Sequence, residues 1–222
     1  MSLDESLKSL FDAERKARTI HNSLVDSPRA ELVRAIGDAT KKALEENDED
    51  EQSLRLTRLA LLLGDLDGDA VVDLLIDILG GDAPEARIAA GEQLEALAFD
   101  RWKEVATGIE RAVARLPSGS PALTELPFLL AEVAEPGCVK LLGRFLKHED
   151  AEAVAAAIEA MAELGDPAAA PLLQALEKDG RQVQIDEEGE RVAIGDLAHE
   201  TRELLEQMME DATADAKRGK SR

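Results

Sequence analysis

The sequence predicts an all-α protein built from pairs of helices that stack on one another. Ala, Leu, Val and Ile supply most of the 45% hydrophobic content, and a chain rich in Ala, Leu and Glu favours helices. Aromatic residues make up only 2%, fewer than a β-sandwich or barrel normally uses. Corners between helices also recur at nearly regular intervals, which is typical of stacked-repeat proteins.

The stretch MAELGDPAAAPLLQALEKDG, residues 161–180, contains the clearest corner. Gly165 can take the left-handed conformation that ends a helix, Asp166 can cap the next helix, and Pro167 suits its first position. One apolar stripe precedes this corner and another follows it. The stripes consist of Val154, Ile158 and Met161, and of Ala169, Leu172, Leu173 and Leu176. We therefore expect a tight turn between antiparallel helices, with a geometric role and no chemical one.

Similar corners occur earlier in the chain. They fall at Asp65, Asp100, Glu135 and Asp166, so that successive corners are 35, 35 and 31 residues apart. A period in this range indicates repeated helical pairs. We expect the pairs at residues 51–80, 82–116, 118–147 and 149–179.

A helical hairpin is expected to precede the repeats, with helices over residues 2–22 and 28–46. Ser27 would cap the second of these helices, and Pro28 would take its first position. The hairpin is either a degenerate repeat or a cap that shields the first core layer, which a terminal repeat would otherwise expose.

The C-terminal part departs from the period. Alternating apolar residues around Val183 and Val192 predict a short β-hairpin or extended loop. A final helix from about Asp196 to Asp211 would cover the last repeat, and the basic tail after it is expected to be disordered. The predicted parts of the chain are thus an N-terminal cap at 1–47, helical repeats at 48–180, a hairpin and capping helix at 181–212, and a tail at 213–222.

The segment AELGDPAAAPLLQALEKD resembles a HEAT repeat of the short bacterial type that is also seen in phycobilin-lyase-like proteins. In that pattern a helix ends in Leu-Gly, Asp-Pro follows, and a second helix carries paired apolar residues. The match is close at residues 149–179, good at 51–80, and loose at 82–116 and 118–147. The resemblance implies a right-handed α-solenoid of about four to five HEAT-like helical hairpins.

The formal charge of −21, from 26 basic and 47 acidic residues, restricts the partners. It would repel a nucleic-acid backbone and an anionic membrane surface, so we expect neither as a partner, and it favours a basic segment on a protein. The single cysteine, Cys138, allows no intrachain disulfide, and its apolar neighbours predict a buried structural thiol. With no membrane-spanning run and no signal peptide, the expected location is the cytoplasm.

Reactive side chains are sparse. The two His-Glu dipeptides, at His148 and His199, resemble the ligand motifs of a HEAT-like family of di-iron hydroxylases. That family uses four such motifs at equivalent positions, whereas here His148 falls in a loop and His199 falls inside a helix. We therefore expect no metal site. Without a nucleophile elbow or a phosphate-binding loop, the sequence also predicts no catalytic residue and no cofactor.

The remaining candidate is a binding strip on the concave face of the solenoid, which the second helix of each pair lines. Alignment of the repeats places Trp102, Lys103, Lys140, Arg144 and Gln174 on this strip. Trp and Arg are the residue types that carry much of the energy at protein interfaces. Trp102 has a second interpretation, as a side chain that fills the joint between two repeats.

Together these observations predict a non-catalytic protein–protein interaction module or scaffold. An immunity or inhibitor protein would be a special case, because an acidic surface speeds association with a basic target. The alternative is an enzyme or enzyme accessory of the bilin-lyase or di-iron HEAT type, although one Trp and four Phe are few for a tetrapyrrole groove. The oligomeric state stays open at this point.

Overall fold

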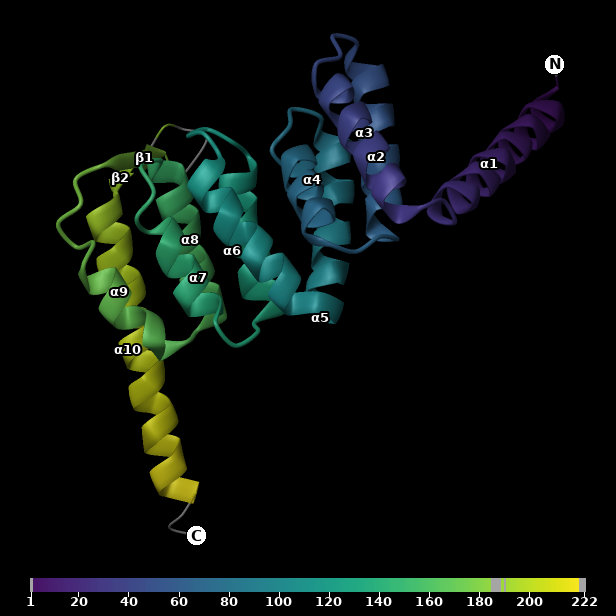
Figure 1. Ribbon diagram of the computed structural model, residues 1–222. Helices are drawn as coiled ribbons and strands as arrows, with labels where there is room; N and C mark the ends of the chain where they lie inside the picture. The colour runs from purple at the N-terminus through teal and green to yellow at the C-terminus, as the bar shows by residue number, and fades with distance from the viewer. Residues whose placement is uncertain (1, 185–188, 190, 220–222) are drawn as a thin grey trace. The chain divides into compact units, whose positions relative to one another are not determined.

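The computed structural model describes the backbone of residues 2–184, 189 and 191–219. These residues form ten α-helices, one short 3-10 helix and a two-stranded sheet, which confirms the all-α class (Figure 1). The chain divides into two compact units, Met1–Ala96 and Leu97–Arg222. We call them the N-terminal unit and the C-terminal unit, and each has its own set of packed helices.

All regular secondary structure among the described residues of the N-terminal unit is helical. They are α1 (Leu3–Val25), α2 (Arg29–Leu44), α3 (Glu49–Gly64), α4 (Asp69–Leu79) and the beginning of α5 (Pro84–Arg115). α2, α3 and α4 pack against one another around a core of Leu, Ile and Val side chains. α1 differs from them, because none of its side chains is buried. The first core layer is therefore covered by α2 and not by the whole N-terminal hairpin.

The C-terminal unit contains the remaining elements. The rest of α5 is followed by α6 (Ala122–Val133), α7 (Cys138–Phe145), α8 (Ala151–Leu164), the 3-10 helix η1 (Pro167–Ala169), α9 (Ala170–Gln174), strands β1 (Gln182–Gln184) and β2 (Arg191–Ala193), and α10 (Ile194–Gly219). α8 packs against α6, α7 and α10, and it buries seven side chains among them. The strands pair antiparallel with Val183 opposite Val192, so the predicted β-hairpin is present.

The corner at residues 165–167 forms as the sequence predicts. Gly165 is left-handed, with φ 63° and ψ 18°, and it ends α8. The Asp166 carboxylate accepts a hydrogen bond from the Ala168 N–H at 2.9 Å, and Pro167 begins η1. This cap confirms the predicted local chemistry of the corner. Asp48 caps α3 in the same way, by accepting from the Glu51 N–H at 3.1 Å.

Two of the predicted helical pairs differ in detail. The corner expected at Asp100 falls at Arg101, where φ −141° and ψ 51° separate two helical stretches of α5 that follow each other without a loop. Neither Gly nor Pro stands there to end the helix, so helical hydrogen bonding resumes directly. In the last pair the second helix ends at Gln174 and not near residue 179. The Asp179 carboxylate accepts from the Arg181 N–H at 3.0 Å, a local turn that competes with helix.

The ends of two helices correct further predictions. Ser27 does not cap α2, because Pro28 is the N-cap and the Ser27 hydroxyl donates back to the Ser23 carbonyl at 3.2 Å. α10 continues to Gly219, so the tail expected to be disordered is helical over 213–219. That stretch is rich in Ala and has no helix breaker before Gly219, which explains the extension. Residues 220–222 of the predicted tail lie outside the described residues.

Hydrogen bonds between neighbouring repeats recur at a nearly constant sequence offset. The offset is between 31 and 34 residues for Ser118 with Glu149, Ser53 with Glu85, Arg181 with His148, Trp102 with Pro136, and Arg144 with Glu110. This range agrees with the spacing of the corners in the sequence. α1 does not follow this repeat offset. His21 contacts Asp65 at the end of α3 and Glu14 contacts Arg58 in the middle of α3, and each pair is 44 residues apart.

Candidate interaction surface

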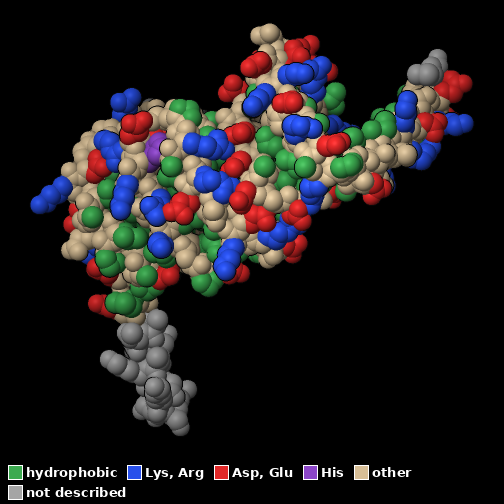
Figure 2. Space-filling view, in the orientation of Figure 1, with side chains coloured by type: hydrophobic (Ala, Val, Ile, Leu, Met, Phe, Trp, Pro, Cys, Tyr) green, Lys and Arg blue, Asp and Glu red, His purple; other side chains and the backbone are tan. Residues whose placement is uncertain are grey.

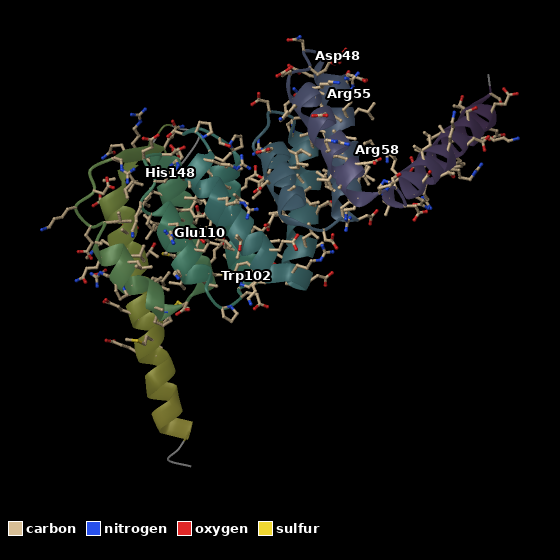
Figure 3. All side chains as sticks on the ribbon, in the orientation of Figure 1. Asp48, Arg55, Arg58, Trp102, Glu110 and His148 are labelled. Atoms are coloured by element: carbon tan, nitrogen blue, oxygen red, sulfur yellow. The ribbon has the colours of Figure 1, made fainter. Side chains whose placement is uncertain are left out.

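A groove of about 230 Å³ lies in the C-terminal unit, between the second half of α5 and the start of α7. Four of the five side chains predicted for the binding strip line it. We call it the Trp102 groove, and its lining residues are Trp102, Lys103, Ala106, Thr107, Glu110, Pro136, Gly137, Lys140, Leu141 and Arg144. Figure 3 labels Trp102 and Glu110 in this unit.

Helical spacing explains why these side chains meet. After the break at Arg101, Trp102 and Glu110 lie eight positions apart on α5 and share one face of the helix. Lys140 and Arg144 are four positions apart on α7 and also share a face. The corner between α6 and α7 brings the two faces together. The groove is therefore a product of the repeat geometry.

Trp102 fills the joint between two repeats and also lines the Trp102 groove. Its side chain is half-buried, and its indole N–H donates to the Pro136 carbonyl at 3.3 Å. This bond ties α5 to the corner between α6 and α7, so the ring fills the joint between two repeats. The same ring lines the Trp102 groove, so part of it is accessible to a ligand. A Trp in this position offers a large and rigid contact area.

The Trp102 groove is cationic, although the chain as a whole is strongly acidic. Three cationic side chains line it, those of Lys103, Lys140 and Arg144, against the single carboxylate of Glu110. Arg144 Nη2 donates to Glu110 Oε1 at 2.6 Å, which fixes both side chains at the edge of the groove. Lys103 and Lys140 are exposed and have no ion-pair partner within the described part of the chain. Two ammonium groups thus remain available to an anionic group.

Gln174 does not belong to this site. It is the last residue of α9, it is exposed, and it does not line the Trp102 groove. Glu110, Thr107 and Pro136 also line the groove, and no pattern in the sequence pointed to them. Glu110 lies 34 residues before Arg144, one repeat period away, and this offset is the signal that could have found it.

The three histidines lie on separate elements. Within the described residues, no group of three or more His, Cys, Asp or Glu side chains is arranged to hold a metal ion. The Nδ1 atom of His148 accepts a hydrogen bond from the Asp150 N–H at 3.1 Å, just before α8. His199, on α10, lies beside Glu177 and Glu203, with N···O distances of 3.5 and 3.2 Å. The two His-Glu dipeptides therefore have different local partners.

Arg181 makes several side-chain hydrogen bonds at the start of β1, although nothing in the sequence singled it out. Its guanidinium donates to both oxygens of the Asp179 carboxylate, and to the carbonyls of His148 and Glu149 at 2.9 and 3.0 Å. The hydrogen bond from Arg181 lowers the pKa of Asp179. Arg181 thereby connects the start of β1 to the loop before α8.

The pKa values of Glu177 and Cys138 are also shifted, each by a local cause. The Arg202 guanidinium donates to Glu177 at 2.6 Å and lowers the pKa of that carboxyl group. Burial raises the pKa of the Cys138 thiol, whose side chain is only 1% exposed. The predicted buried thiol is therefore confirmed. A thiol of this kind is inert, because the reactive thiolate form is disfavoured.

Comparison with known proteins identifies the repeats. Residues 125–187 match the family model of HEAT repeats. No curated protein sequence matches the chain. Among solved structures, an engineered protein is similar at 21% identity and a TM-score of 0.35, over 86% of this chain and 89% of that one, a level that supports no argument. No helix in the described part of the chain is long and apolar enough to cross a bilayer. The resemblance seen in the sequence is thus confirmed by the match of residues 125–187 to the HEAT-repeat model.

Proposed function

We propose that this chain is a non-catalytic protein–protein interaction module that binds a partner protein through the Trp102 groove. Helical repeats commonly serve this role, because their stacked helices present extended binding surfaces. The observation that carries the proposal is the grouping of Trp102, Lys103, Lys140 and Arg144 around one groove. Trp and Arg at the centre of an interface typically dominate its binding energy. A cytoplasmic location is part of the same proposal.

The chemistry of the groove indicates what would enter it. Its two unpaired ammonium groups favour a carboxylate, and the Trp102 ring and Leu141 favour an apolar side chain next to that carboxylate. A short acidic segment of a partner protein therefore suits the groove. The net charge of −21 favours basic segments on a partner, and these would contact the acidic surface outside the groove.

The test is capture of partners by immobilised protein, followed by affinity measurement for whichever partner is recovered. The groove variants are Trp102→Ala and Lys140→Glu, and each is expected to weaken binding by about thirtyfold, as for an interface hot spot. Lys140 is exposed, so Lys140→Glu keeps the fold intact if Trp102→Ala does not.

Matched controls come from the same unit. Phe99→Ala removes an aromatic ring that is 59% exposed and does not line the groove, and Lys147→Glu reverses an exposed charge just after α7. Both controls should bind the partner like the wild type. Equal binding by the groove variants and the controls would rule out the Trp102 groove as the site.

The absence of catalysis is the second part of the proposal and has its own test. Elemental analysis and an absorption spectrum of the purified chain should show neither stoichiometric iron nor a visible chromophore. Either signal would favour the alternative, an enzyme or enzyme accessory of the di-iron or bilin-lyase type.

A further inference from the structure

An apolar helix face without a partner runs along α1. The helix has 23 residues, and none of its side chains is buried. Its large apolar side chains nevertheless recur at the spacing of a helix that packs against another surface. They are Leu3, Leu7, Leu10, Phe11, Ile20 and Leu24, which are between 40% and 85% exposed. Figure 2 shows apolar side chains at the surface of this helix.

A groove of about 950 Å³ adjoins the second half of α1 within the N-terminal unit. α1 lines one side of it with residues from Glu14 to Leu24, and α2 and α3 contribute much of the rest. The α3 side includes the apolar side chains of Leu59, Leu61 and Leu62. No residue before Glu14 lines the groove, so the first half of α1 extends past it. We call this space the α1 groove.

Two polar contacts hold α1 beside the α1 groove. His21 Nε2 lies 2.6 Å from Asp65 Oδ2, and Arg58 Nη2 donates to Glu14 Oε2 at 3.3 Å. Both contacts involve exposed or half-buried side chains, and neither closes the space between the helices. Figure 3 labels Arg58, together with Arg55, on α3. The apolar lining of the groove is thus left open to a ligand.

The charges of the α1 groove are opposite to those of the first half of α1. The groove is lined by four cationic side chains, Arg18, Lys42, Arg55 and Arg58, against the carboxylates of Glu14 and Asp65. Arg18 and Lys42 have no ion-pair partner within the described part of the chain. The first half of α1 carries three carboxylates, Asp4, Glu5 and Asp12, against the single cation of Lys8. An acidic helix with an apolar stripe suits a cationic groove with an apolar lining.

We propose that the α1 groove binds the first half of α1 from a second copy of this chain. A chain cannot fill its own groove in this way, because the second half of the same continuous helix forms one side of it. In a pair of chains the exchange is reciprocal, since each copy has one projecting half-helix and one groove. The result is a two-fold symmetric dimer in which the same surface is used twice. It covers the apolar residues that α1 leaves exposed in the single chain.

The test is the molar mass of the full chain over a dilution series, by sedimentation or by light scattering after size exclusion. The wild type is expected to be a dimer that dissociates on dilution. Leu7→Glu should weaken the dimer by at least about tenfold, because the substitution acts at two symmetric positions. Leu7 is already 50% exposed, so the variant should stay folded, which circular dichroism checks. Ile88→Glu, at an apolar residue of α5 that is 64% exposed and outside the groove, should leave the dimer intact.

A second pair of variants distinguishes the groove from simple contact between two α1 helices. Lys42 lines the α1 groove and its exposed neighbour Lys41 does not, so both substitutions to Glu make the same charge change on α2. Lys42→Glu should weaken the dimer by about tenfold relative to Lys41→Glu. Equal effects of the two would overturn the proposal, as would a wild-type chain that is monomeric throughout or a Leu7→Glu variant that remains dimeric.

Discussion

α1 and α8 are both amphipathic helices, and the fold uses them in opposite ways. α8 has 14 residues and buries seven of them. α1 has 23 residues and buries none. α8 packs against α6, α7 and α10, whereas α1 has few neighbours in its own unit. The apolar pattern of a helix predicts that the helix forms, and it does not by itself predict that the apolar face is covered.

The repeat period explains the difference. Contacts of the loop before α8 reach residues 31 to 33 positions away, the offset that stacks one repeat on the next. The links from α1 to α3 span 44 residues and lie outside that period. In a repeat protein a helix buries its face against the equivalent elements of its neighbours. A helix outside the period lacks those neighbours, so its apolar face stays uncovered within the chain.

The largest expected effect is a contrast between two Ile→Ala substitutions. Ile158→Ala, in α8, removes a side chain that is 2% exposed, and should lower the free energy of unfolding by about 2–5 kcal/mol. Ile20→Ala, in α1, removes one that is 51% exposed, and should change it by less than about 0.5 kcal/mol. Urea denaturation of both variants in dilute protein measures the contrast. Similar losses in the two variants would contradict it.

The N-caps of the two helices provide the next contrast. Asp150 caps α8 through the Glu152 N–H and also accepts from the Gly119 N–H at 2.7 Å, so it joins two repeats. Asp150→Ala should cost about 1–2 kcal/mol of unfolding free energy. Ser2 caps α1 together with Glu5 and touches no other element through that cap. Ser2→Ala should fray α1, visible as lost helical circular dichroism, without moving the main unfolding transition.

A smaller effect is expected at the end of α8. Gly165→Ala places a Cβ on a left-handed residue and 3.2 Å from the Met208 Cε atom of α10, so it should cost about 1 kcal/mol. Gly180→Ala is the control, since a Cβ there would meet nothing within 4 Å. Thermal unfolding of both variants measures the difference. Equal melting temperatures would indicate that the corner does not need its left-handed residue.

The smallest expected effect depends on pH. The pKa of Asp179 is lowered by its hydrogen bond from Arg181, so the folded chain holds this carboxylate ionised more strongly than the unfolded chain does. Its stabilisation is fully present above the ordinary carboxyl pKa of about 4 and is lost as pH falls through the lower, folded value. The wild type should therefore exceed Asp179→Asn in stability at neutral pH, by a margin that shrinks below about pH 4. A stability difference between the two proteins that does not change with pH would show that the ionised Asp179 carboxylate is not its cause.

Local chemistry at the corners could be predicted from the sequence, and the lengths of the helices between them could not. Gly165, Asp166 and Pro167 have narrow conformational preferences that fix a corner without help from the rest of the chain. The break at Arg101 lies one residue from the predicted corner at Asp100, but no residue of this kind marks it, and the absence of a loop between the two helical stretches could not be predicted. The early end of α9 depends on the Asp179 turn and on the contacts of Arg181 with the loop before α8, which no local pattern reveals.

The predicted binding strip was likewise right where it depended on the corners and wrong where it depended on the length of a helix. Trp102, Lys140 and Arg144 lie near well-placed corners, and the period was sufficient to align them on one groove. Gln174 was aligned on the assumption of a full-length second helix, and the short α9 leaves it elsewhere. The openness of α1 could not be predicted, because its apolar stripe reads like that of a buried helix. Only the structure shows which stripes have a partner within the chain.

Hydrogen exchange measured residue by residue on the Leu7→Glu variant tests the contrast between α1 and α8 most directly. This variant is expected to weaken the proposed dimer, so in dilute solution α1 keeps only its contacts within the chain. The amides of α8 should exchange at the slow rate set by unfolding of the C-terminal unit, and those of α1 should exchange orders of magnitude faster through local opening. Protection of α1 equal to that of α8 would contradict the claim that the repeat period decides which helix faces are buried.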